Sequence, residues 1–372
     1  MPRPLGLAAL ALFLTVSACD TGSGTDCVVG TDPGCPAPPP DADEVVAGVN
    51  LTALFAAPTA AERDSVAARL ARTGGTAAAP VTGAVVTDLG ADPDATRYVL
   101  LDLRGADGAS IAFALARVPA LDGGPATPLR TVLLVPDGSG DASEAGFLTG
   151  PGAGGLDREA VQVVVAARGA SLTARGRTYT SAVPADPYRA DVADLLALTD
   201  QLGRVPRTNP ARLGAVGVGR GGAVVLLAAE RRPGRFLAVS SLGAPTTLFD
   251  ATVRTDARNV LQGRPSSLPA AAALFAPVLA LRDGRVGLAE ARLRLLELSA
   301  VALADRLPAT LSFHAEPDDV VPTAHLARLR EEGEGTFEAP RRFVPVPEGD
   351  HASLLSSNDV RGPLATFLLA RL

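Results

Sequence analysis

Apolar and polar positions in the main part of the chain change repeatedly between the spacing of strands and the spacing of helices. The apolar runs that predict strands are 131–135, 161–166, 213–218, 236–242, 310–313 and 342–346, preceded by a hairpin of 98–103 and 111–118. The segments with helical spacing are 188–202, 221–231, 323–331 and the C-terminus. Strands that alternate with helices imply an α/β fold with a mostly parallel central sheet and helices on both faces.

The same pattern sets the expected domain boundaries. Residues 45–95 are predicted to be an N-terminal helical prelude, because Thr59 and Glu62 form a capping box and the following helix ends at Gly74. The main domain is predicted to span 96–372 and to contain a helical insert at 246–306. We assign no chemistry to the prelude helix.

The N-terminus has the features of an export signal. Arg3 precedes an apolar run at 5–16 that is too short to span a bilayer. The next residues, Val16 to Cys19, resemble a bacterial lipobox. This resemblance implies a lipoprotein signal peptide at 1–18 and a lipid on the Cys19 thiol, which would anchor the protein to a membrane of the bacterial cell envelope. The alternative is an ordinary signal peptide that ends at Ala18.

Residues 19–44 are expected to form a lipidated tether that is rich in proline at 36–40. Cys27 and Cys35 lie in this tether, and export to an oxidising compartment makes a disulfide between them the expected state. The formal net charge of −6 argues against nucleic acid or an anionic membrane surface as a partner.

We expect neither a metal nor a cofactor. The cysteines lie in the tether, and the spacing of the three histidines does not suggest a metal site. The histidines are His314, His325 and His351.

The hexapeptide Gly217–Gly222 lies between a predicted strand and a predicted helix and has two interpretations. As G-x-G-x-x-G it would bind a dinucleotide, which requires an acidic residue at the end of the next strand. The next strand, 236–242, contains no acidic residue. As G-x-S-x-G it is a nucleophile elbow in which Gly219 stands at the position of the serine.

Two later segments favour the elbow. Residues 311–322 are similar to the segment that supplies the catalytic acid in α/β-hydrolases, with Asp318 at the acid, and 344–351 are similar to the segment that supplies the base, with His351. The chain therefore resembles an α/β-hydrolase of the prolyl-oligopeptidase-like or dienelactone-hydrolase-like kind over about residues 96–372. Taken singly, Asp318 could be an acid at a helix N-terminus and His351 a loop residue.

Two positions depart from the family. Gly219 replaces the nucleophile, and Pro136-Asp137-Gly138 replaces the usual His-Gly-Gly that shapes the oxyanion hole. The backbone N–H groups of Arg220 and Asp137 are expected at the oxyanion position. Glycine adopts the positive φ of an elbow without strain, so the turn is expected to persist, with Gly219 within about 7 Å of the His351 ring.

These departures leave two hypotheses of function. The first is a protein of serine-hydrolase descent that no longer catalyses and instead binds a small-molecule or protein ligand. The second is an esterase- or peptidase-like hydrolase, in which His351 and Asp318 activate a water at the place of the missing Oγ or Ser139 reaches the site. The sequence does not identify the ligand.

Overall fold

The structure is a computed structural model of the 372-residue chain. It describes residues 43–73, 80–120, 127–266, 268, 271–333 and 340–372. Residues Glu44–Leu372 form one compact unit. The predicted signal peptide, Cys19, Cys27 and Cys35 lie outside the described residues.

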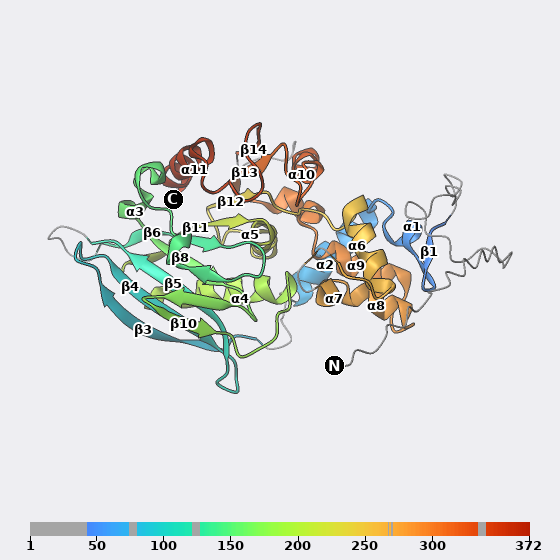
Figure 1. The fold of residues 1–372 in the computed structure, drawn as a ribbon, viewed down its shortest axis with the longest axis horizontal. Helices are drawn as coiled ribbons and strands as arrows, with labels where there is room; N and C mark the ends of the chain where they lie inside the picture. The colour runs from blue at the N-terminus through green and yellow to red at the C-terminus, as the bar shows by residue number, and fades with distance from the viewer. Residues whose placement is uncertain (1–42, 74–79, 121–126, 267, 269–270, 334–339) are drawn as a thin grey trace, which may run out of the picture. The chain divides into compact units, whose positions relative to one another are not determined.

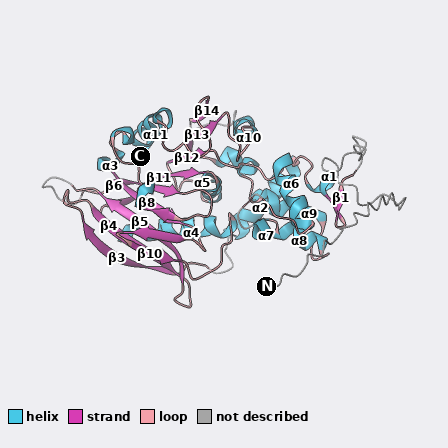
Figure 2. Cartoon of the chain, in the orientation of Figure 1, coloured by secondary structure: helices cyan, strands magenta, loops and turns pink. Residues whose placement is uncertain are grey.

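A nine-stranded sheet is the centre of the described part of the chain, with the order β14-β13-β12-β11-β6-β8-β5-β4-β3 (Figures 1 and 2). The strands are β3 (Gly83–Ala91), β4 (Arg97–Arg104), β5 (Ser110–Val118), β6 (Leu129–Val135), β8 (Ala160–Ala166), β11 (Thr208–Val218), β12 (Ala238–Leu242), β13 (Ala309–Ala315) and β14 (Arg341–Val346). Strands β8, β6 and β11 to β14 are parallel to one another, whereas β5 pairs antiparallel with β8, and β4 and β3 continue the sheet in antiparallel pairs. The expected mostly parallel sheet is present.

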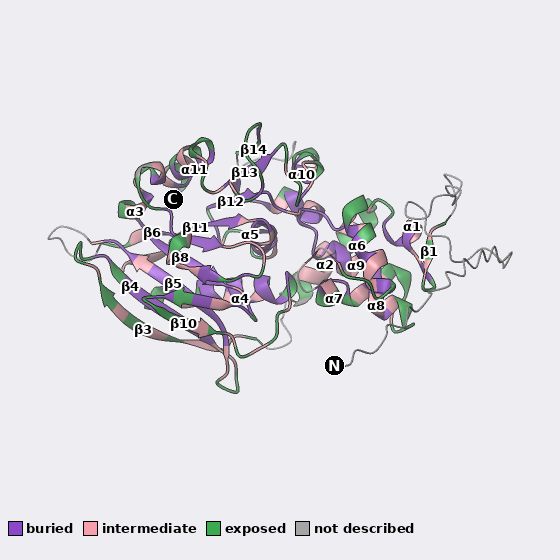
Figure 3. Ribbon diagram, in the orientation of Figure 1, coloured by how far each residue is buried: buried purple, intermediate pink, exposed green. Residues whose placement is uncertain are grey.

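Hydrophobic side chains fill both faces of the sheet because successive residues of a strand point to opposite faces. In β6, Leu133 and Val135 join the core on the side of α4 (Arg189–Gln201) and α5 (Arg220–Arg231). Val132 and Leu134 join the core on the side of α3 (Leu156–Glu159) and α11 (Asn358–Arg371). Figure 3 shows these inner strands largely buried. A strand buried on both faces is a continuous apolar run, which is the pattern that predicted it.

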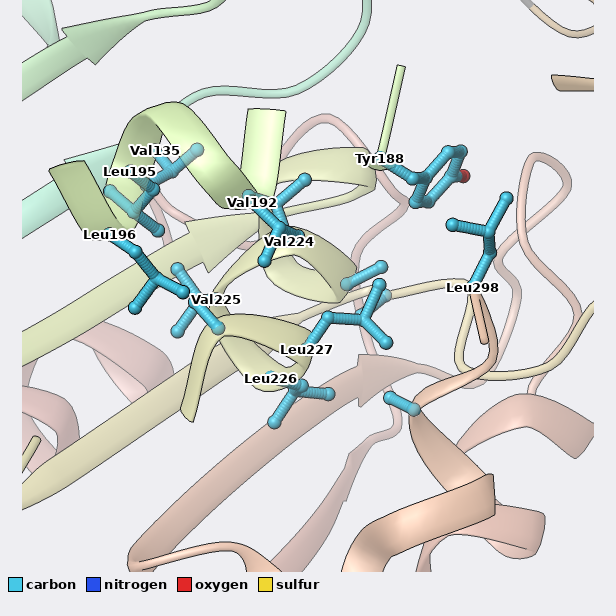
Figure 4. Packing of buried hydrophobic residues seen from close by; sticks show 14 of the residues in the cluster. Val135, Tyr188, Val192, Leu195, Leu196, Val224, Val225, Leu226, Leu227 and Leu298 are labelled. Atoms are coloured by element: carbon cyan, nitrogen blue, oxygen red, sulfur yellow. The ribbon is translucent and has the colours of Figure 1, made fainter. Parts of the chain in front are cut away.

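Helix α5 fixes the position of the elbow through its packing. Its residues from Gly221 to Glu230 are all buried. Figure 4 shows Val224 and Val225 of α5 against Val192 and Leu195 of α4, in the core that also contains Val135 of β6. Because α5 begins at the residue after Gly219, this packing holds the start of the helix against the end of the sheet.

The predicted insert is helical and packs with the prelude. The insert contains α6 (Ala251–Leu261), α7 (Ala271–Leu274), α8 (Ala276–Arg282), α9 (Leu288–Leu296) and the 3₁₀ helix η4 (Ala300–Arg306), and it contacts α1 (Leu51–Leu54) and α2 (Ala60–Thr73). Arg292 of α9, which is buried, donates to Glu62 of α2 and to the carbonyls of Ala53 and Leu54. The prelude and insert therefore form one helical layer, although they are far apart in sequence.

The structure differs from the expected helical prelude at 45–95, because Gly83–Ala91 is strand β3 of the main sheet. Most of its residues are exposed or half-buried at the sheet edge, so it lacks the apolar run of the inner strands.

The sequence pattern also did not predict five short strands, which are β1 (Val45–Val46), β2 (Val49–Asn50), β7 (Ala142–Ser143), β9 (Ser171–Ala174) and β10 (Arg177–Thr180). The remaining helix, α10, spans Ala324–Gly333. Among the described residues, none of the helices has the length and apolar character needed to cross a membrane.

Candidate functional site

The turn from β11 into α5 has the geometry of a nucleophile elbow. Gly219 occupies φ 48° and ψ −121°, a conformation that costs about 1–3 kcal/mol for other residues. Its N–H donates to the carbonyl of Leu242 over 2.8 Å. A Cβ at Gly217 would lie 2.2 Å from the Gly221 carbonyl oxygen, and one at Gly221 would lie 2.3 Å from the Val135 carbonyl oxygen. The flanking glycines are therefore needed for the close approach of strand and helix.

Sheet register brings Asp137 next to Gly219. Strand β6 is parallel to β11, and Val135 pairs with Gly217 at the last matched position. Continuing both chains by two residues places Asp137 opposite Gly219. The Asp137 side chain therefore reaches the elbow from the neighbouring strand.

The Asp137 carboxylate occupies the space next to Gly219 that a serine side chain would need. Its Oδ1 accepts a hydrogen bond of 2.8 Å from the backbone N–H of Arg220. Its Oδ2 lies 2.9 Å from Nε2 of His351. A Cβ built on Gly219 would lie 1.9 Å from Oδ1. The expected backbone donor of Arg220 is thus present, but Asp137, expected as a second backbone donor, instead enters the site with its side chain as an acceptor.

His351 and Asp318 are brought together at the other side of this carboxylate. Nδ1 of His351 lies 2.8 Å from Oδ2 of Asp318. Oδ1 of Asp318 accepts from the N–H groups of Val320 and Val321 at 3.0 and 2.7 Å, which fixes its orientation in the loop after β13. The result is a continuous series of hydrogen bonds from Arg220 through Asp137 and His351 to Asp318.

His351 can lie here because Gly243, at the end of β12, has no side chain. A Cβ at Gly243 would lie 2.9 Å from Nδ1 of His351, and the residue has a φ of +58°. The imidazole is buried. A glycine after β12 thus provides space for a ring that comes from the loop after β14.

The charges in this series favour an imidazolium between two acidic side chains. The hydrogen bond to Asp137 is the largest influence on His351, burial opposes it, and the hydrogen bond to Asp318 adds to it, so that the pKa of His351 is raised to about 9. For Asp137, burial acts to raise the pKa, but hydrogen bonds from His351 and from the N–H groups of Arg220 and Gly138 hold the pKa below its usual value. At neutral pH His351 is therefore protonated and cannot accept a proton as a general base.

The side chain of Arg220 ties the elbow to α4. Its Nε lies 3.6 Å from Oδ2 of Asp191, and both side chains are largely buried. Burial raises the pKa of Asp191 to about 6, and the positive charge of Arg220 opposes this rise. Asp191 also accepts a hydrogen bond from the N–H of Tyr188 at the start of α4. These contacts position Arg220 without using its backbone N–H, which faces Asp137.

Ser139 does not reach the site. Its Oγ donates to Asp141 over 2.6 Å and is exposed.

His314 does reach the site, which the sequence did not indicate. The residue is buried, and its Nε2 donates to the Val321 carbonyl over 2.7 Å. The same nitrogen lies 3.5 Å from Oδ2 of Asp318. Burial lowers the pKa of His314, which favours the neutral form of its ring beside Asp318.

Within the described ranges, no cluster of three or more His, Cys, Asp or Glu side chains has an arrangement that could hold a metal ion. His325, the third histidine, lies apart from the site and faces Asp250 at 3.1 Å. What the site offers chemically is a carboxylate, an imidazolium and a second carboxylate in series, at the end of a parallel sheet.

The sheet, the elbow and the order of these residues define an α/β-hydrolase fold of the prolyl-oligopeptidase-like kind. The model of the prolyl oligopeptidase family matches residues 156–258, which include the elbow and α5. No curated protein matches the chain.

Solved structures support the same fold at low identity. Acetyl xylan esterase 1 from Thermoanaerobacterium sp. JW/SL YS485 aligns with a TM-score of 0.54 and 14% identity over 84% of this chain and 94% of its own. The acetyl xylan esterase from Paenibacillus sp. R4 gives 0.54 and 14% over 86% and 99%. A Bacteroides ovatus protein described as a dipeptidyl aminopeptidase IV gives 0.50 and 17% over 78% of this chain but only 36% of its own. At these identities the likeness concerns the fold alone.

Proposed function

We propose that this chain is a hydrolase-fold protein that does not catalyse serine-type hydrolysis and acts by binding a ligand or partner. The observation on which the proposal rests is the Asp137 carboxylate, which fills the space beside Gly219 and bonds both the Arg220 N–H and His351. A serine hydrolase needs that space for its nucleophile and that N–H for the oxyanion.

Three separate requirements of acyl transfer are unmet at neutral pH. Gly219 has no hydroxyl to attack a carbonyl. The N–H of Arg220 already donates to Asp137. His351, with a pKa of about 9, has its proton and so cannot take one from a nucleophile. In subtilisin the loss of the serine alone reduces kcat by about 10⁶.

The wild-type protein is therefore expected to give no covalent adduct with a fluorophosphonate at pH 7. Intact-protein mass spectrometry after incubation measures this directly, with an active serine esterase in the same tube as the control for the reagent. An adduct at Ser139 or at any other residue, which a His351→Ala change abolishes, would contradict the proposal.

The second candidate is a hydrolase in which Asp318 and His351 act on a water. The observation that favours it is the 2.8 Å contact between these two side chains. The water cannot lie where we expected it, because Asp137 fills that space, so Asp137 would have to turn toward solvent, to which its side chain is 35% exposed. Hydrolysis of p-nitrophenyl acetate that increases as the pH passes 9 and depends on His351 would favour this candidate.

We also propose that the protein is exported and held on a membrane of the cell envelope by a lipid on Cys19. The support is the order of a short apolar run, small residues and Cys19 at the N-terminus. Bacterial cells that express the full chain should incorporate radiolabelled palmitate into it and retain it in the membrane fraction. Cys19→Ala should remove the label. A labelled Cys19→Ala protein, or an unlabelled wild type, would contradict the lipoprotein.

A further inference from the structure

A concave site lies between the helical layer and α10, apart from the hydrogen-bonded series of Asp137, His351 and Asp318. It is a cavity of about 400 Å³, which is within the usual range for small-molecule sites. Its walls come from α2 and the segment before it, the segment from β12 into α6, α9, η4, and α10 with the residue Pro322 that precedes it. Gly219, Asp137, Asp318 and His351 are not among its lining residues.

Most of the cavity wall is apolar. Phe249, Leu296, Val301 and Pro322 come from four different segments and line the same space. Phe249 is held in place by an edge-to-face contact with Phe55, with the ring centroids 6.3 Å apart. An apolar concave surface with one well-fixed aromatic ring favours an apolar ligand, because binding would remove the apolar surfaces of both the ligand and the cavity wall from water.

The charged side chains of the cavity each have a partner. Arg63 of α2 forms an ion pair with Glu332 of α10. Arg328 pairs with Glu331 at 3.3 Å on the exposed face of α10.

Asp250 is the third such group. Oδ1 of Asp250 accepts from the N–H groups of Thr252 and Val253, and its Oδ2 lies 3.1 Å from Nε2 of His325. Both arginines of the cavity are thus paired with glutamates, and Asp250 is itself negative, with its Oδ2 buried and without a hydrogen bond. No positive charge is therefore available for an anionic ligand, whose charged group would be desolvated without a partner, which is costly.

The His325–Asp250 pair does not make this cavity a catalytic site. Nδ1 of His325 accepts from the backbone N–H of Thr246 at 3.1 Å and Nε2 faces Asp250, so both ring nitrogens are occupied. The imidazole is 3% exposed. Its geometry is that of a structural group that fixes the wall of the cavity.

We infer that this cavity binds an uncharged, mainly apolar small molecule. The inference deepens the binding role proposed above by giving the class of its ligand and the place where it binds. It shares no residue with the Asp137–His351 series, so the two can be tested separately.

The test uses two dyes that share one ring system. N-phenyl-1-naphthylamine is uncharged, and 8-anilino-1-naphthalenesulfonate has the same rings with a sulfonate. The full-length wild type should bind the uncharged dye saturably at one site, and the sulfonate should bind at least about tenfold more weakly, the equivalent of 1.4 kcal/mol. Equal or tighter binding of the sulfonate would overturn the inferred ligand class.

Two alanines on α10 provide matched variants. Ala324 and Ala327 are both exposed, but only Ala324 lines the cavity. Ala324→Trp should fill the space and weaken the uncharged dye at least about tenfold, whereas Ala327→Trp should leave its affinity unchanged. The chain has no native Trp, so both variants can be checked for folding by their Trp emission and thermal melting.

If both tryptophan variants fold and bind the dye as the wild type does, or if the wild type shows no saturable binding, the cavity is not the site. These results leave the fluorophosphonate result unaffected. Conversely, a wild type that reacts with the fluorophosphonate would contradict the non-catalytic proposal while the dye data could still locate the cavity as a binding site.

Discussion

The double variant Asp137→Gly/Gly219→Ser is expected to react with a fluorophosphonate, whereas the wild type and Gly219→Ser alone are expected not to react. A new serine needs an empty space beside position 219, a free oxyanion donor and a neutral His351. Removing the Asp137 carboxylate supplies all three, because that one group fills the space, accepts from the Arg220 N–H and is the largest influence raising the pKa of His351. The single change supplies only the hydroxyl.

Gly219→Ser alone also faces a steric conflict. The new Cβ would lie 1.9 Å from Oδ1 of Asp137, so the carboxylate must turn away and give up its hydrogen bonds with Arg220 and His351. The serine would in addition have to adopt a φ near 48°, which costs about 1–3 kcal/mol. We therefore expect this variant to be less stable than the wild type, by urea denaturation.

Control variants show which groups are responsible for labelling of the double variant. Asp137→Gly alone should not react, because no hydroxyl is present, and adding His351→Ala to the double variant should abolish its reaction. Labelling is measured by mass spectrometry and the modified residue by peptide mapping. If Gly219→Ser reacts as fast as the double variant, Asp137 does not block the site. If a folded double variant stays unlabelled, the series around His351 is not a latent hydrolase triad.

The pair of Asp318 and His351 could be expected from the sequence because local motifs mark both residues. Each lies in a short loop that follows a predicted strand, and the carboxyl ends of parallel strands meet at one edge of a sheet. The sequence also indicated that a glycine at 219 would adopt a positive φ, which the structure has at 48°. Local pattern and strand order were sufficient for these residues.

The role of the Asp137 side chain could not be derived in the same way. Its position in the motif suggested a backbone donor, and a motif does not specify where a side chain points. The position of the Asp137 side chain is determined by the register between β6 and β11, in which Val135 is paired with Gly217. An acidic residue two positions beyond a strand that neighbours the elbow strand is the signal that would have found it.

The cavity was beyond sequence reasoning for a different reason. Its lining residues lie at 57–63, 247–252, 296–302 and 322–332, and the link between the first group and the insert depends on buried Arg292. Each group by itself is an ordinary amphipathic or loop segment. Only long-range packing of the prelude on the insert makes them one surface, and hydrophobic periodicity does not determine which helices pack together.

Asp137→Asn is expected to change the pH dependence of stability in the alkaline range. The folded pKa of His351 is raised to about 9, above the unfolded value of about 6.5. A raised pKa stabilises the fold at low pH, so this contribution is fully present below about pH 6.5 and is lost as the pH increases through 9. Its full size is about 3 kcal/mol for one histidine, and the Asp137 carboxylate is its largest source.

The measurement is urea unfolding of the wild type and Asp137→Asn between pH 6 and pH 10, together with the NMR titration of the His351 Cε1–H. The free energy of unfolding of the wild type should fall relative to that of the variant across this range, and the His351 titration of the variant should move to lower pH. Asparagine keeps the shape of the side chain and its acceptor for the Arg220 N–H, so packing changes little. If His351 titrates at the same pH in both proteins, the Asp137 carboxylate does not hold its proton, and the electrostatic part of the proposed block of the site is wrong.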